Sequence, residues 1–164
     1  MSIEEGAKVI VDTCMGVEPH DKVVILTDRE TMNIGKKIRE QVLDKTNDVR
    51  FYNLDIYGER PLDKLPKQIE KEAEDASVTF FVAQTIKGEL DTVRMPFFNA
   101  GVMGGRHAHM MGLTEEILKE GINVDYEKIA DFTEKVNSLA VDTDEITVKA
   151  DNGTDFTAKV GRYK

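Results

Sequence analysis

Two histidines that stand two residues apart are the strongest candidates for chemistry in this 164-residue chain. His107 and His109 lie in the stretch "GRHAHMMGLTEEIL". On a β-strand, residues two apart point to the same face, so both imidazoles could bind one cation such as zinc or iron. A catalytic metal needs at least a third ligand, and no acid stands at a diagnostic spacing such as His-Glu-x-x-His. We therefore predict no metal ligand in this chain; His107 and His109 are the candidate ligands if a metal ion binds. The competing interpretation is a strand end with hydrogen-bonded or partly exposed imidazoles.

The sequence lacks the usual signatures of nucleotide binding and of nucleophilic catalysis. The first predicted strand-to-helix turn, "TDRETMN", has no glycine, and "GVMGG" precedes a predicted strand instead of following one. We therefore expect no dinucleotide or P-loop site. There is no G-x-S-x-G elbow, and the only cysteine, Cys14, is expected on the buried face of a helix. Catalytic residues stay unassigned, and we expect this chain to bind no cofactor.

Polar side chains stand where the predicted strands end. "LTDRE" and "AQT" follow the first and third apolar runs, and "RHAHMM" forms a short fourth strand. In an open α/β sheet, ligands favour the crevice beyond the carboxyl ends of the strands. The possible ligand rim consists of Asp28, Thr85, His107 and His109. For Asp28 and Thr85, helix capping or hydrogen bonding within a turn is the commoner use.

The apolar pattern predicts strands and helices in alternation. The runs at residues 23–26, 49–54 and 78–83 predict three core strands that are neighbours in one sheet, and the first has the apolar, β-branched composition of a buried strand. Helical spacing of apolar residues predicts helices, with Thr114 as the cap of a further one. These helices are expected near residues 3–14, 34–42, 65–73, 96–102 and 126–136. The order predicts an α/β fold, doubly wound, with a mainly parallel sheet and helices on both faces.

The pattern changes near the carboxyl end. "EITVKADNGTDFTAKVGRYK" alternates in polarity as two antiparallel strands do, around the turn at residues 151–153. We therefore expect an α/β Rossmann-like domain at residues 1–141 and a β-hairpin at residues 142–164. Two strands alone are marginally stable, so the hairpin is expected to be the start of a further domain absent from this chain.

The composition narrows the classes of partner. Hydrophobic residues make up 40% and charged residues 32%, which indicates a folded protein. The net charge of −9 opposes binding to nucleic acid and to anionic membranes, so we expect neither as a partner. No apolar run approaches the roughly 20 residues of a membrane span, and the amino terminus does not resemble a secretory signal. With one cysteine, no internal disulfide can form, and we expect a cytoplasmic location.

Several short motifs occur together in a familiar order. Met111, Gly112, Leu113 and Thr114 precede a glutamate-rich helix, a tyrosine-containing helix follows, and "GTDFT" (residues 153–157) stands in a later strand. With the opening "AKVIVDTCMGVEPHDKVVI", these motifs resemble the amino-terminal part of the aminopeptidase T and aminopeptidase S group of metallo-aminopeptidases. One departure is visible, because a methionine at position 111 stands where that family usually has proline.

The resemblance implies a part of a metal-dependent aminopeptidase that lacks its catalytic domain. In that family, paired metal ions are bound by Glu, His and Asp residues of a carboxyl-terminal domain. The resemblance therefore implies no metal ligand in this chain; a divalent metal (zinc, cobalt or manganese) and a peptide substrate are expected only for a full-length enzyme. It also implies a homo-oligomer, such as a dimer. The chain alone is expected to be inactive. The alternatives are a free-standing small-ligand-binding α/β domain and an independent metal site on His107 and His109.

Overall fold

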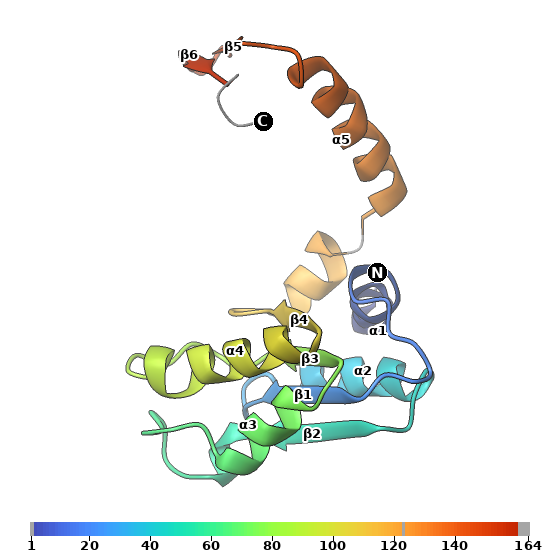
Figure 1. The fold of residues 1–164 in the computed structure, drawn as a ribbon, viewed down its shortest axis with the longest axis vertical. Helices are drawn as coiled ribbons and strands as arrows, with labels where there is room; N and C mark the ends of the chain where they lie inside the picture. Colours follow the sequence, from blue (N-terminus) through green and yellow to red (C-terminus); the bar gives the residue numbers. More distant parts are fainter. Residues whose placement is uncertain (1, 123, 161–164) are drawn as a thin grey trace. The chain divides into compact units, whose positions relative to one another are not determined.

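The computed structural model of the chain describes residues 2–122 and 124–160, which divide into two compact units (Figure 1). The first unit comprises residues 1–123 and the second residues 124–164. The sequence placed the boundary between residues 141 and 142 instead. Helix α5 (Tyr126–Ala140), none of whose residues is buried, lies in the second unit together with the hairpin.

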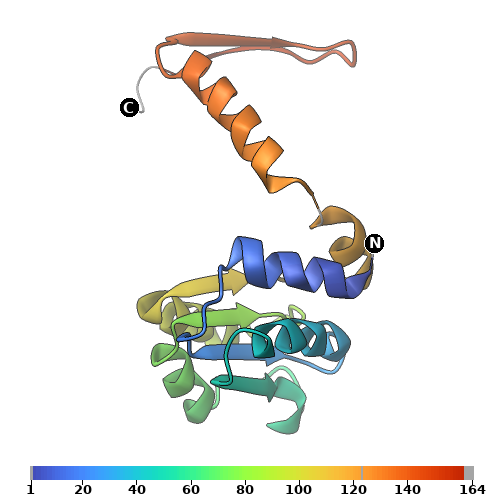
Figure 2. The same ribbon diagram turned by 90° about the vertical axis from the view of Figure 1, so that its right-hand side faces the viewer.

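The first unit is built on a parallel sheet in the order β2-β1-β3-β4 (Figure 2). The strands are β1 (Val23–Thr27), β2 (Val49–Asn53), β3 (Val78–Phe81) and β4 (Arg106–His109). All neighbouring pairs in this sheet are parallel. Every residue of β1 and β3 is buried, as expected for central strands covered on both faces. The prediction that three apolar runs are neighbours in one sheet is confirmed.

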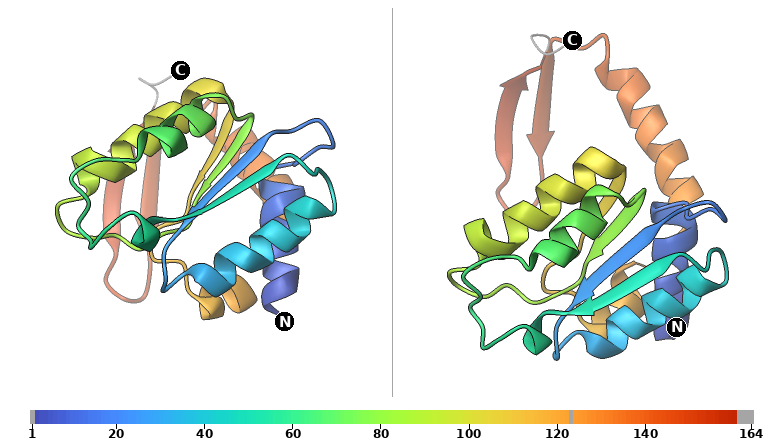
Figure 3. Two further views of the ribbon diagram at one scale, coloured as in Figure 1. Left: turned by 90° about the horizontal axis from the view of Figure 1, so that it is seen from below. Right: turned by 60° about the horizontal axis from the view of Figure 1, so that its bottom comes forward.

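Helices cover both faces of this sheet (Figure 3). One face carries α1, η1, α2 and η4, and the other carries α3 and α4. The bounds are α1 Ile3–Lys8, η1 Val9–Cys14, α2 Met32–Leu43, η2 Leu54–Ile56, α3 Lys67–Glu74, η3 Leu90–Arg94, α4 Met95–Gly104 and η4 Ile117–Gly121. The expected α/β fold with helices on both faces is confirmed.

Alternating side chains of the strands build two separate cores. Ile25 and Phe80 belong to the core beneath α1 and α2, whereas Leu26 and Phe81 belong to the core beneath α3 and α4. Each of these four side chains is fully buried. Burying one such side chain stabilises the fold by about 1.5–3 kcal/mol, so the two cores hold the strand ends in fixed positions.

The prediction that Cys14 lies on a buried helix face is wrong. Its side chain is exposed, whereas Val11 and Met15 on either side are buried. The helix widens into a π-helical turn here, in which the Met15 amide donates to the Ile10 carbonyl oxygen at 2.9 Å. A π-turn rotates later residues away from the positions that a 3.6-residue period predicts, which takes Cys14 out of the core.

The second unit consists of α5 and an antiparallel hairpin. The hairpin strands are β5 (Glu145–Lys149) and β6 (Asp155–Lys159), which form a sheet of their own. Gly153 occupies the turn with φ +93°, a conformation that favours glycine. The predicted hairpin is confirmed. Within the described residues, no helix is both long and apolar enough to span a membrane.

Candidate functional site

The carboxyl ends of the strands collect most of the polar residues that the sequence singled out. Asp28 follows β1, Thr85 lies in the exposed loop beyond β3, and His109 ends β4. His107 lies two residues earlier in β4, opposite Thr79 of β3. The sheet builds outward in two directions from β1, so the topological switch point, where such folds bind ligands, lies between the ends of β1 and β3.

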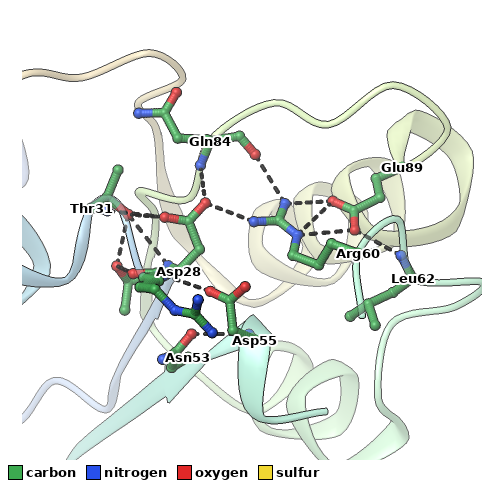
Figure 4. Close-up of polar contacts among 10 residues, drawn as sticks. Asp28, Thr31, Asn53, Asp55, Arg60, Leu62, Gln84 and Glu89 are labelled. Carbon is green, nitrogen blue, oxygen red and sulfur yellow. Dashed lines mark hydrogen bonds and ion pairs between the residues drawn. The ribbon is translucent and has the colours of Figure 1, made fainter. Parts of the chain in front are cut away.

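Asp28 is buried at this switch point and accepts four hydrogen bonds (Figure 4). One carboxylate oxygen accepts from the amide and the hydroxyl of Thr31, at 3.0 and 2.9 Å. The other accepts from the Gln84 amide at 2.6 Å and from Nη1 of Arg60 at 2.7 Å. A carboxylate has about four acceptor positions, so the hydrogen-bonding capacity of Asp28 is used within the chain.

Arg60 joins Asp28 to a second buried carboxylate, Glu89 (Figure 4). Nε of Arg60 donates to Oε1 of Glu89 at 3.0 Å, and Nη2 donates to the Gln84 carbonyl oxygen at 3.0 Å. Oε1 of Glu89 also accepts from the Leu62 amide at 2.8 Å. The Arg60 guanidinium therefore links the segments that follow β1 and β3 at the switch point.

Hydrogen bonds keep these three groups charged in spite of their burial. Burial alone would raise the pKa of Asp28, but the amides of Thr31 and Gln84 and the Arg60 guanidinium outweigh it, so the pKa is lowered. The pKa of Glu89 is lowered in the same way, mainly by Arg60 against its burial. Burial opposes the charge of Arg60, yet its carboxylate partners raise its pKa. In this arrangement Asp28 has the role of a structural ion-pair partner.

His107 and His109 lie on the same face of β4 and are hydrogen-bonded to each other. Nε2 of His107 lies 3.0 Å from Nδ1 of His109, and Nδ1 of His107 lies 2.7 Å from the hydroxyl of Thr79. The two facing nitrogens therefore share a hydrogen bond at the place where a common cation would have to bind. The part of the chain that the structure describes contains no group of three or more His, Cys, Asp or Glu side chains arranged to hold a metal ion.

Aromatic side chains enclose the two imidazoles. Phe81 stacks on His109 with ring centres 4.9 Å apart, and the edge of Phe98 contacts both histidines. Burial, and then the neighbouring His109, lower the pKa of His107 to about 4. Burial, and then the charge of Arg94, lower the pKa of His109. Both rings are therefore neutral at neutral pH.

A glycine of α4 makes room for this hydrogen-bond chain. A Cβ atom at Gly101 would lie 2.2 Å from Oγ1 of Thr79 and 2.8 Å from Nδ1 of His107. Both distances are too short for any real carbon atom, so a larger residue would force α4 away from the sheet. The glycine-rich "GVMGG" stretch thus includes a close-packing position in addition to the predicted helix end.

The short motifs singled out in the sequence around Gly112 and Gly153 have backbone roles here. Gly112 takes φ +68° in the turn after β4, and the hydroxyl of Thr114 accepts from the Ile117 amide at 3.2 Å, as a helix cap does. In the hairpin, Gly153 forms the turn, and the hydroxyl of Thr157 lies 3.0 Å from that of Thr147 on the partner strand. These residues shape turns, a cap and a strand pair.

Sequence reasoning missed three residues of this region, namely Arg60, Glu89 and Arg94. Arg60 and Glu89 are separated by 29 positions in the chain. Neither stands in an apolar pattern that indicates burial, so the sequence carried no local signal for them. Arg94 lies where η3 meets α4, and one of its guanidinium nitrogens contacts the sulfur of Met111.

Comparison with models of known protein families gives no match for this chain, and comparison with curated proteins gives none. Among solved structures, wild-type AmpT from Thermus thermophilus is similar at 12% sequence identity with a TM-score of 0.49. The similarity covers 84% of this chain and 48% of that one, so the chain spans about half the length of AmpT. This is a weak likeness of fold.

Proposed function

We propose that the chain is an amino-terminal α/β domain of an aminopeptidase T-like, metal-dependent aminopeptidase. In this proposal it carries no catalytic metal ion, and it covers the active site, supports a dimer or limits the length of the peptide substrate. The metal ions would be bound by a catalytic domain that is not part of the 164 residues considered. The chain by itself would then release no amino acid from a peptide.

The observation that carries the proposal is the order and use of the family-like motifs. The stretch at residues 111–114 leaves the parallel sheet, and "GTDFT" at residues 153–157 forms part of a separate hairpin, in the order on which the resemblance to the family rests. Gly112 and Gly153 both adopt positive φ, which explains why glycine stands at each position. Residues that shape backbone, and do no chemistry, fit a supporting domain.

Two features of the sheet edge support the absence of catalysis in this chain. Asp28 is bound by Arg60 and by backbone amides, so it offers no free oxygen to a metal ion or to a substrate. The facing nitrogens of His107 and His109 are bound to each other. Metal-assisted hydrolysis needs several protein ligands and one open coordination position.

Metal content and peptidase activity of the purified chain test the supporting role. After incubation with zinc, cobalt or manganese and dialysis, we expect trace metal and no hydrolysis of leucine p-nitroanilide. The double variant His107→Asn, His109→Phe should match the parent, as should the control His20→Asn at an exposed histidine. Near-stoichiometric metal that disappears in the double variant alone, or hydrolysis that does so, would establish an independent metal site and end the proposal.

The gene downstream of codon 164 tests the family assignment. A reading frame that continues into a region with clustered Glu, His and Asp codons supports the missing catalytic domain. A stop codon directly after codon 164, with no such region encoded nearby, would instead favour a free-standing α/β domain.

A further inference from the structure

The hydroxyl of Thr79 determines how protons are placed on the two histidines. Thr79 is fully buried, and within the described residues its hydroxyl has one hydrogen-bond partner, Nδ1 of His107 at 2.7 Å. A buried hydroxyl proton without an acceptor costs free energy, so the hydroxyl donates and Nδ1 accepts. The proton of neutral His107 is then on Nε2, which donates to Nδ1 of His109 at 3.0 Å.

The series of hydrogen bonds from Thr79 through His107 ends at His109, whose Nε2–H is left to donate. Because Nδ1 of His109 accepts, the proton of its neutral ring must be on Nε2. The stacking of Phe81 and the edge contact of Phe98 hold the plane of this ring. The carboxyl end of β4 therefore presents one N–H group whose orientation is set by a buried threonine.

Arg94, whose charge acts on His109 and whose guanidinium contacts Met111 two residues further along, has no carboxylate partner among the described residues. Within the described residues, Arg60 and Arg106 form ion pairs with buried carboxylates, but Arg94 forms none. Among the described residues its buried Nε has no hydrogen-bond partner, and Nη2 contacts the sulfur of Met111, which is a weak acceptor. The chain has 31 acidic residues, yet none of those described pairs with Arg94. A ligand could supply the acceptor that this guanidinium lacks.

We propose that Nε2 of His109 and the guanidinium of Arg94 bind the carboxylate of a small, partly apolar molecule at the carboxyl end of β4. The imidazole N–H and one planar guanidinium suit a planar, singly charged acceptor better than a phosphate, which carries more charge. Exposed apolar side chains next to Arg94 in the chain and at its sulfur contact, namely Met95 and Met111, suit an aliphatic group on the ligand. A free amino acid and the end of a short peptide both offer this chemistry.

This site lies outside the Asp28 network and does not depend on the proposed peptidase relationship. His109 and Arg94 belong to the first unit, and the metal and peptidase assays above involve neither carboxylate binding nor Arg94. A failed carboxylate titration would leave the proposed function standing, and a stop codon after codon 164 would leave the carboxylate site standing, whereas a metal site on His107 and His109 would end both.

Titration of the ¹⁵N-labelled chain followed by NMR tests the proposal, with 4-methylpentanoate as the probe. We expect the side-chain Nε2–H signal of His109 to shift on binding, with acetate binding more weakly because it lacks the aliphatic group. The neutral 4-methylpentanamide and inorganic phosphate serve as comparison ligands. A charge-assisted hydrogen bond is worth about 1.5–3 kcal/mol, so Arg94→Gln should weaken binding by about tenfold or more. His109→Phe, which keeps a ring against Phe81, should weaken it as well.

Arg39→Gln, on the exposed surface of α2, is the matched control and should bind as the parent does. The proposal fails if 4-methylpentanoate does not bind the parent chain, or if the amide binds equally well. It also fails if Arg94→Gln binds unchanged while its melting temperature matches the parent, or if phosphate binds more tightly than the carboxylates. The NMR spectrum of the free chain adds a separate check, because both imidazoles must be in the Nε2–H form.

Discussion

His107 should make the stability of the protein depend on pH in the mildly acidic range. Its pKa is lowered from 6.5 to about 4 in the folded chain, chiefly by burial. The folded form binds the proton less readily than the unfolded form. The stability that the neutral His107 ring contributes is therefore fully present above the pKa of the unfolded form. It is lost as the pH falls from 6.5 towards 4.

The two pKa values give the size of the effect. Between pH 7 and pH 5 the unfolded histidine becomes protonated while the folded one stays neutral, which removes at most about 2 kcal/mol of stability. The figure is an upper value because the ring is half-buried and not fully enclosed. Protonation of His107 would also break the hydrogen bond from the Thr79 hydroxyl, because Nδ1 of an imidazolium carries a proton and cannot accept.

Urea unfolding of the parent and of His107→Asn at pH 7 and pH 5 measures this contribution. Asparagine keeps an acceptor near the Thr79 hydroxyl but does not titrate. The variant loses ring contacts with Phe97 and Phe98 at both pH values, so the informative quantity is the change in unfolding free energy between them. We expect that change to be smaller in the variant by up to about 2 kcal/mol.

The pKa values of Asp28 and Glu89 are lowered, so the stability that these carboxylates contribute is lost only as the pH falls further. That loss is the same in the parent and in His107→Asn. His20→Asn, at an exposed histidine, is the control and should keep the parental pH dependence. If His107→Asn loses as much stability between pH 7 and pH 5 as the parent, the assignment of a neutral, buried His107 is refuted.

Three further changes test the packing around the sheet edge. Arg60→Met leaves two buried carboxylates without a countercharge and should destabilise the fold by about 3–5 kcal/mol in urea unfolding; a loss below about 1 kcal/mol would contradict a buried ion-pair network. Gly101→Ala places a carbon 2.2 Å from Oγ1 of Thr79 and should cost about 1–3 kcal/mol by calorimetry. Gly121→Ala, where the added carbon meets only ordinary contact at 3.6 Å, should not lower the melting temperature. Ile69→Ala removes a fully buried side chain of α3 and should cost about 2–5 kcal/mol; an unchanged denaturation midpoint would mean that α3 does not cover the sheet.

The sequence alone determined the elements and their order. Apolar runs predicted β1 and β3 as core strands, and alternation around Gly153 predicted the hairpin. These predictions succeeded because burial on one or both faces repeats along the chain with the period of the element, which is a local property. The one misplaced side chain, Cys14, lies in a π-turn that breaks that period.

The sequence also predicted that His107 and His109 share one face of a strand, because residues two apart on a strand point to the same side. It did not show that a threonine 28 positions earlier determines their protonation, or that Arg94 lies near them. Nor did it show that Asp28 meets an arginine 32 positions later. Such contacts join loops and strand ends that approach only after the sheet has formed and the helices have packed. Periodicity therefore determined which residues form each layer, and only the tertiary structure decided which polar groups meet at the edge of the sheet.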